Sequence, residues 1–311
     1  MLAFFVNRKT LFLQRYSMVD SMALKTNIKQ LDMLRDFSSA FSRGAFTDII
    51  KYEDYSYLDW LHSEYGSNNN GVVTCGEYLK SLYSEMLKNY RCEYVYKNEL
   101  ISHIVRQYKT TNTIAFNEFK VGDSIVDIAL FNGESKAFEI KTEFDSSRRL
   151  DKQMRDYRKV FDKCYVVVPA EKIEDYAHCI DDEIGMLSLS KTRGRVVMQV
   201  FREAIINETI DSDVLITCLR TKEYEQVIRD YYGELPKVPD YEMYEECKKI
   251  MRAIPKEKLK TSFLDLMKNR KKNIQVLLKV PKELRQIYLS MNLLPKDIDV
   301  LTDRLEMKLN R

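Results

Sequence analysis

The stretch from 125 to 144, Ile-Val-Asp-Ile-Ala-Leu-Phe-Asn-Gly-Glu-Ser-Lys-Ala-Phe-Glu-Ile-Lys-Thr-Glu-Phe, decides the fold of this chain. Its two apolar runs are rich in strand-forming residues and flank Asn132-Gly133, a dipeptide that favours a tight turn between antiparallel strands. Asp127 interrupts the first run, and Glu139 and Lys141 lie two residues apart in the second, so those two side chains share one face. Because burying an unpaired charge is costly, these side chains need partners, and a bound metal ion would be one.

Strand and helix periodicities alternate around this stretch and predict an α/β core. A continuous apolar run that ends at Pro169 is typical of a strand buried on both faces. The predicted elements, in chain order, are a helix over 94–108, strands over 114–121, 124–131 and 136–142, a helix over 151–161, a strand over 164–168, and a possible hairpin formed by 186–189 and 196–201. The core therefore has the order helix, three strands, helix, strand.

Helical patterns predominate on both sides of this core. The clearest loop signal is 67–71, Ser-Asn-Asn-Asn-Gly, and Thr74 is expected to cap the helix that follows it. Residues 233–239 are a candidate linker within the C-terminal helices. The predicted division is an N-terminal helical region over 1–72, an α/β domain over 73–203 and a C-terminal helical region over 204–311.

Composition excludes several classes of protein. Six cysteines without a Cys-x-x-Cys pair, together with only three histidines, argue against a structural zinc site and favour reduced thiols. No run reaches the length of a transmembrane helix and the N-terminus lacks a signal-peptide pattern, so a cytoplasmic protein without membrane contact is predicted. Phosphate-binding loops, dinucleotide fingerprints and nucleophile elbows are absent from the sequence. The net charge of +3 does not by itself indicate a nucleic-acid-binding protein.

The charged residues of the two strands suit one kind of chemistry, the hydrolysis of a phosphodiester. This reaction requires a hard cation that neutralises developing charge and activates water. Mg²⁺ prefers oxygen ligands and keeps several waters, so the carboxylates of Asp127 and Glu139 and the carbonyl of Ile140 would suffice, with Mn²⁺ as a substitute. Lys141 would orient the attacking water and stabilise negative charge at phosphorus.

An acid on one strand followed by Glu-x-Lys on the next, in this order of elements, resembles the PD-(D/E)XK superfamily of restriction-endonuclease-like nucleases. Gln153 and Tyr157, spaced Gln-x-x-x-Tyr on the following helix, are similar to an additional motif of its exonuclease-like branch. Residues 139–145 look like those of poorly characterised bacterial and phage-borne members. One departure is Val126, since superfamily members often have proline before the aspartate.

The resemblance implies a restriction-endonuclease-like core and metal-dependent cleavage of DNA, in phage or mobile-element defence or in DNA processing. It implies that Gln153 and Tyr157 support the substrate or Lys141. It also implies an acid on the first helix that helps to hold a second metal ion, for which Glu93 is preferred and Glu99 is the alternative.

A basic cluster follows the third strand and continues into the next helix. Its members could contact DNA phosphates, or they could form the solvated face of a helix, since aspartates are interspersed among them. The residues predicted to contact nucleic acid are Arg148, Arg149, Lys152 and Arg155.

Three interpretations of the site remain open at this point. The first is an active nuclease, and the second is a nuclease-like binding module that is catalytically silent or depends on a partner. In the third, Asp127, Glu139 and Lys141 form an exposed ion-paired set on the sheet of an unrelated α/β protein. The helical flanks would offer surfaces for a second copy of the chain or for another protein.

Overall fold

The computed structural model describes residues 28–66, 72–108, 112–192, 195–270 and 274–310. Contacts divide the chain into two compact units, Met1–Tyr90 with Asp303–Arg311 and Arg91–Thr302. The predicted loop at 67–71 and the predicted helical pattern within 1–27 lie outside the described residues. The division of the chain at residues 72 and 203, which was inferred from the sequence, stays a prediction.

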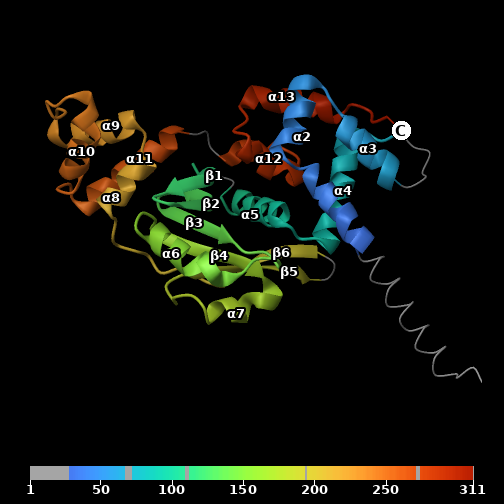
Figure 1. Ribbon diagram of the computed structural model, residues 1–311, viewed down its shortest axis with the longest axis horizontal. Helices are drawn as coiled ribbons and strands as arrows, with labels where there is room; N and C mark the ends of the chain where they lie inside the picture. Colours follow the sequence, from blue (N-terminus) through green and yellow to red (C-terminus); the bar gives the residue numbers. More distant parts are fainter. Residues whose placement is uncertain (1–27, 67–71, 109–111, 193–194, 271–273, 311) are drawn as a thin grey trace, which may run out of the picture. The chain divides into compact units, whose positions relative to one another are not determined.

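A six-stranded mixed sheet forms the centre of the second unit, and its strands are neighbours in the order in which the chain forms them (Figure 1). The first two strand pairs and the last are antiparallel, whereas β4 is parallel to both of its neighbours. The strands are β1 (Ile114–Val121), β2 (Ser124–Phe131), β3 (Ser135–Ile140), β4 (Lys163–Pro169), β5 (Gly185–Thr192) and β6 (Arg195–Arg202). The predicted α/β class and the predicted order of elements are confirmed.

Tight turns join the three antiparallel strands at the start of the sheet. Gly133 has a φ of +71° between β2 and β3, and Gly122 has a φ of +56° between β1 and β2. Glycine adopts these left-handed conformations without the strain that a Cβ would cause. The predicted Asn132-Gly133 turn is therefore confirmed, and it sets the register in which Ala129 lies opposite Ala137.

Helices cover both faces of the sheet. α5 packs on the face that carries Phe138 and Tyr165, and α6 packs on the face that carries Ala137 and Val166. The helices of this unit are α5 (Glu93–Gln107), α6 (Leu150–Arg158), α7 (Ile173–Ala177), α8 (Ser212–Leu215), α9 (Thr221–Tyr232), α10 (Asp240–Met251), α11 (Lys256–Arg270) and α12 (Arg285–Ser290). Short 3-10 turns occupy Ser147–Arg149, Ala170–Lys172, Ile216–Cys218, Ile274–Leu278 and Lys282–Leu284.

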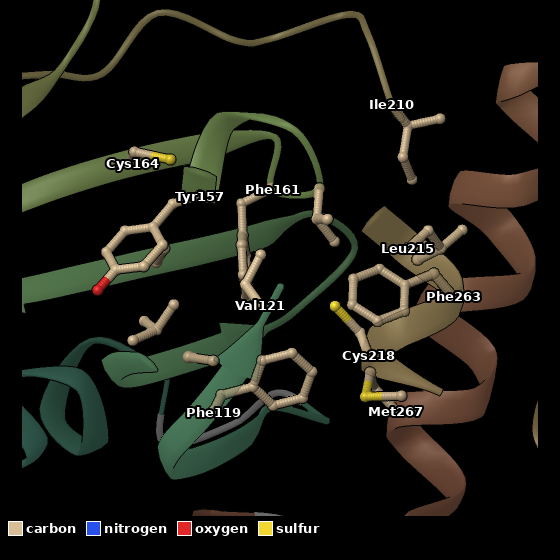
Figure 2. Packing of buried hydrophobic residues seen from close by; sticks show 14 of the residues in the cluster. Phe119, Val121, Tyr157, Phe161, Cys164, Ile210, Leu215, Cys218, Phe263 and Met267 are labelled. Carbon is tan, nitrogen blue, oxygen red and sulfur yellow. The ribbon is translucent and has the colours of Figure 1, made fainter. Parts of the chain in front are cut away.

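The C-terminal helices share one hydrophobic core with the sheet. Phe263 of α11 lies edge-to-face against Phe131 of β2, with ring centroids 5.3 Å apart. Phe119 and Phe161 also pack against Phe263 in this aromatic cluster (Figure 2). Aromatic side chains bury large areas, so this cluster stabilises the sheet and α11 together. The predicted linker at 233–239 is confirmed, because Gly233 ends α9 in a left-handed conformation and α10 begins seven residues later at Asp240.

The first unit is helical. Residues 28–39 are helical, and they are followed by α2 (Arg43–Thr47), a π-helical turn (Asp48–Tyr52), α3 (Ser56–Tyr65) and α4 (Cys75–Asn89). Thr74 and Glu77 form a reciprocal capping box at the start of α4, which confirms the predicted cap. Backbone hydrogen bonds join Cys75 to Met307 and Leu309 to Val73, so the end of the chain belongs to this unit. The helix α13 (Pro295–Leu305) precedes that end, and only its last residues, from Asp303, are counted with this unit.

No helix within the described ranges combines the length and the apolar character that crossing a bilayer requires.

Candidate active site

The predicted site lies where β2 and β3 separate. The antiparallel pairing of these strands ends at Ile128 and Phe138, one residue before the two predicted carboxylates. Beyond that point the Asp127 side chain takes over the role of the missing strand partner, because its Oδ2 accepts the N–H of Ile140 at 2.8 Å. In a strand, the N–H and the C=O of one residue point to the same side, which places the Ile140 carbonyl on the Asp127 side of β3.

Glu139 is the most connected side chain of the site. Its Oε1 accepts hydrogen bonds from Lys141 Nζ at 2.9 Å and from Gln153 Nε2 at 2.6 Å. Lys141 Nζ also donates to Gln153 Oε1 at 3.1 Å, which closes a triangle of polar groups between β3 and α6. The Glu139 side chain is only 5% exposed, so this carboxylate depends on its protein partners.

Tyr157 joins the carboxylate to the hydrophobic core. Its hydroxyl lies 2.7 Å from Glu139 Oε2 and 2.6 Å from the carbonyl oxygen of Ile125, so its one proton can be donated to either acceptor. The ring lies in the core cluster and the hydroxyl points away from Phe161 and Phe263 (Figure 2). Burial, and then the neighbouring Glu139 charge, raise the pKa of Tyr157, so the phenol stays protonated and acts as a donor.

A lysine that was not predicted from the sequence completes the site. Lys97 of α5 places its Nζ 2.5 Å from Glu93 Oε1 and 3.1 Å from Asp127 Oδ1. The structure thus brings Glu93 to the site through Lys97, whereas Glu99 lies two residues further on, about 200° around the helix from Lys97. Its spacing of four residues from Glu93, within the apolar pattern of the helix, makes Lys97 a candidate for a buried residue, but no signal in the sequence indicates its contact with Asp127.

Burial dominates the electrostatics of the site. It raises the pKa of Asp127, and Lys97 and the Ile140 N–H offset only part of this effect. It also raises the pKa of Glu139, and the nearby Asp127 charge raises it further against the opposing effect of Lys141. Burial disfavours the charge on Lys97, but Asp127 and Glu93 outweigh it, so the pKa of Lys97 is raised. Two carboxylates that repel one another in a buried site favour a bound cation.

The loop after Lys141 is held in place by its own polar contacts. Thr142 donates its N–H and its hydroxyl to Asp145 Oδ2, at 2.8 and 2.7 Å. Arg91 forms an ion pair of 2.8 Å with Glu143. These acids therefore stabilise the loop that leads from the site to the basic cluster.

The site offers oxygen donors of the kind that a hard cation prefers. A carboxylate offers about four acceptor positions. Asp127 uses two of them and Glu139 uses three, so three positions remain, and the Asp127 side chain is 20% exposed and accessible from solvent. Among the described residues, no group of three or more His, Cys, Asp or Glu side chains is arranged to hold a metal ion. Two carboxylates and a backbone carbonyl would hold Mg²⁺ with waters completing its coordination.

The predicted basic cluster divides into two parts. Lys152 and Arg155 form ion pairs along α6 with Asp156 and Asp151. Arg148 and Arg149, in the 3-10 turn before α6, are exposed, and no ion pair among the described residues involves either of them. The two arginines before α6 are thus better placed to meet a ligand phosphate than the two basic residues on it.

Comparisons with known proteins give one curated relative and one solved structure. The chain is 21% identical to protein cII of Enterobacteria phage P4 over 177 residues, which are 56% of this chain and 66% of that protein. The match therefore spans just under two thirds of the relative's length. A solved structure, the SPO1766 protein of unknown function from Silicibacter pomeroyi, is 17% identical and aligns with a TM-score of 0.30 over 44% of this chain and 90% of its own. A likeness this weak carries no structural argument.

A family model supplies the assignment. The model described as bacteriophage P4 protein cII matches residues 86–301, a span that contains all the strands of the sheet and every predicted site residue. Because this match covers well over half of the 311 residues, the chain belongs to the bacteriophage P4 protein cII family.

Proposed function

We propose that this protein is a nuclease that hydrolyses phosphodiester bonds of DNA with Mg²⁺ or Mn²⁺ as its cofactor. One observation carries the proposal, the hydrogen-bonded set of Glu139, Lys141 and Gln153 beside Asp127 where β2 and β3 separate. A purely structural ion pair on a sheet needs only two charges. This set adds a glutamine, a tyrosine and an accessible second carboxylate, all held by neighbouring elements.

Lys141 is the residue best placed to act on the substrate. An ammonium group has three N–H donors, and Glu139 and Gln153 receive two of those of Lys141. The third can be donated to an attacking water or to a phosphate oxygen. Because Glu139 and Gln153 fix the position of the ammonium in advance, little reorganisation is needed as charge develops on the phosphate.

The proposed reaction is the hydrolysis of one P–O bond. A bound Mg²⁺ or Mn²⁺ would neutralise charge on the phosphate and lower the pKa of a bound water. The water oxygen attacks phosphorus, the bond to the leaving sugar oxygen breaks, and that oxygen takes up a proton. One product strand therefore ends in a phosphate and the other in a hydroxyl. Gln153 and Tyr157 hold Glu139, and so Lys141, in the required geometry.

A binding module with the same fold is the second candidate. One observation favours it, because lysines already neutralise both carboxylates, Lys97 at Asp127 and Lys141 at Glu139. Under this interpretation the module binds DNA and does not cleave it unless a partner completes the site. For either candidate we infer a cytoplasmic protein that acts in phage or mobile-element defence or in DNA processing, as the nuclease resemblance implies.

A cleavage assay separates the two candidates. The purified chain is incubated with linear, circular and single-stranded DNA and with RNA, in Mg²⁺, in Mn²⁺ and in a chelator. We expect metal-dependent cleavage of DNA, and a loss of about 100-fold or more for Lys141→Met, the cost typical of removing a group that stabilises transition-state charge. Asp127→Asn should lose activity as well.

Lys136→Met is the matched control for this assay. Lys136 lies on the same strand as Glu139, but its ammonium pairs with Glu134 at 2.8 Å, away from the site. The control should cleave like the wild type. Wild-type cleavage by both Asp127→Asn and Lys141→Met contradicts the proposal, and DNA binding without cleavage in either metal favours the binding module.

A further inference from the structure

Among the described residues, no other lysine or arginine is as fully buried as Lys97 of α5. The Lys97 side chain is 6% exposed, and its ammonium contacts acids from two different elements, Glu93 of α5 and Asp127 of β2. Moving an ammonium group out of water costs several kcal/mol unless its partners are well placed. The contacts at 2.5 and 3.1 Å meet that condition.

Packing alone does not explain a lysine at this position. Its helix neighbours Tyr96, Leu100 and Ile101 are fully buried, and an apolar side chain of similar volume often replaces a buried ion pair without loss of stability. The pair with Glu93 could be a local helix contact, since these residues are four apart. The contact with Asp127 is not local. It places a fixed positive charge against a predicted metal ligand.

The position of this charge corresponds to that of a cation shared by two carboxylates. Sites that use two metal ions hold them about 3.5–4 Å apart, with carboxylates bridging them or binding each one. Here Glu93 and Asp127 are the pair available to a second ion, and the Lys97 ammonium already lies between them. The remaining acceptors of Asp127 and Glu139 are left for the other ion.

The charge balance of the site agrees with this geometry. Glu93, Asp127 and Glu139 contribute three negative charges. Lys97 and Lys141 contribute two positive charges, which leaves a net charge of −1 when all five groups are ionised. One divalent cation changes this to +1, whereas two would leave a strongly positive buried site.

We propose that Lys97 takes the place of a second metal ion between Glu93 and Asp127, so that the site binds one divalent cation. This inference rests on the proposed metal-dependent function. Lys97 acts as a positioning residue, since it holds Asp127 and Glu93 by its charge. An ammonium group cannot take a water as a ligand, so positioning of the attacking water falls to Lys141 and to the single ion.

The test counts bound metal in the absence of DNA. Mn²⁺ is titrated into the full chain by calorimetry, and electron paramagnetic resonance reports whether two bound ions are coupled. We expect one tightly bound ion in the wild type. Lys97→Met leaves Glu93 and Asp127 without their shared ammonium, so it should bind two Mn²⁺ ions with a spin-coupled signal.

Three further variants test whether the number of bound Mn²⁺ ions depends on the charge of Lys97. Lys97→Arg keeps the charge and should bind one ion. Lys97→Met combined with Glu93→Gln removes a ligand of the second ion and should also bind one. Lys136→Met removes a partly buried lysine of β3 that pairs with Glu134, and it should leave the number of bound ions at one.

The outcomes separate this inference from the function on which it rests. A wild-type protein that cleaves DNA and binds two ions overturns the role of Lys97 and leaves the nuclease in place. A protein that binds no Mn²⁺ and cleaves nothing overturns both. Circular dichroism checks that Lys97→Met is folded, and if the folded variant still binds one ion, the inference is overturned. If this variant does not fold, the number of Mn²⁺ ions bound by the wild-type protein tests the inference instead.

Discussion

The two sides of helix α6 (Leu150–Arg158) both carry polar groups, but these groups differ in what they contact. On the inner side, Gln153 and Tyr157 contact Glu139, which comes from another element and is almost fully buried. On the outer side, Asp151 and Arg155 form an exposed pair within the helix itself. Exposed pairs one turn apart contribute little to stability, whereas a buried pair cannot lose one partner without a large cost. The burial of a partner's charge, rather than the number of charges, therefore distinguishes a site from a solvated face.

The largest expected difference between the two sides of α6 follows from removing one acid that forms hydrogen bonds on each side. Glu139→Ala leaves the Lys141 ammonium buried without its carboxylate, so we expect the free energy of unfolding to fall by about 3–5 kcal/mol. Asp151→Ala breaks only the exposed pair and should cost under about 0.5 kcal/mol. Urea denaturation of both variants measures the difference. Equal losses would mean that the inner set is as solvated as the outer one.

A smaller effect is expected from removing one hydroxyl of the inner side. Tyr157→Phe deletes the donor to Glu139 and to the Ile125 carbonyl, and we expect a loss of about 1.5–3 kcal/mol, the range for hydrogen bonds to charged groups. Tyr176→Phe is the matched control, since its hydroxyl donates a long hydrogen bond of 3.4 Å to a backbone carbonyl, that of Asp145. Thermal denaturation of both variants tests this, and a control that loses as much as Tyr157→Phe contradicts it.

Asp156 lies between the two sides and gives a prediction about pH. Burial alone would raise its pKa, but hydrogen bonds from Lys152, Ser124 and Lys159 outweigh this and lower the pKa of Asp156 to about 2, from 3.8. A carboxyl whose pKa is lower in the folded state stabilises the protein above its unfolded pKa. That stabilisation is lost as the pH falls through the folded value.

We therefore expect Asp156→Asn to cost about 1–2 kcal/mol near pH 6, since solvent screens the two lysines, and the cost should shrink as the pH falls from about 4 towards 2. Urea denaturation of the wild type and the variant at pH 6 and pH 3 measures the change. A cost that is the same at both pH values contradicts the assignment of these hydrogen bonds.

Most of the site around Glu139 was predictable from the sequence because the signals that indicate it are local. The Asn132-Gly133 turn and the alternation in the strands place Asp127 and Glu139 at one end of a hairpin. The predicted strand over 136–142 ends two residues earlier in the structure, at Ile140. The difference arises because β2 and β3 separate there and the Asp127 side chain replaces a backbone partner.

The role of Lys97 was not predictable from the sequence, for a physical reason. Its contact with Asp127 joins α5 to β2 across thirty residues of chain, and it depends on the strands separating at the site. Periodicity assigns a residue to a face of its helix but not to a partner on another element. The shared core of α11 and the sheet escaped prediction for the same reason, since Phe263 and Phe131 meet only in the folded chain.

The smallest expected effect concerns the exposed basic residues before and on α6, and it assumes that the protein binds DNA. Arg148→Ala or Arg149→Ala removes an exposed guanidinium that is free to meet a phosphate, so each should reduce the dependence of log affinity on log salt by about 1. Lys152→Ala should change this dependence less, because Asp156 already neutralises that lysine at 2.7 Å. Fluorescence anisotropy with a labelled duplex at several salt concentrations measures the slopes. If Lys152→Ala lowers the slope as much as the arginine variants do, the ion pairs of α6 open to bind DNA, and the outer side takes part in recognition rather than only in solvation.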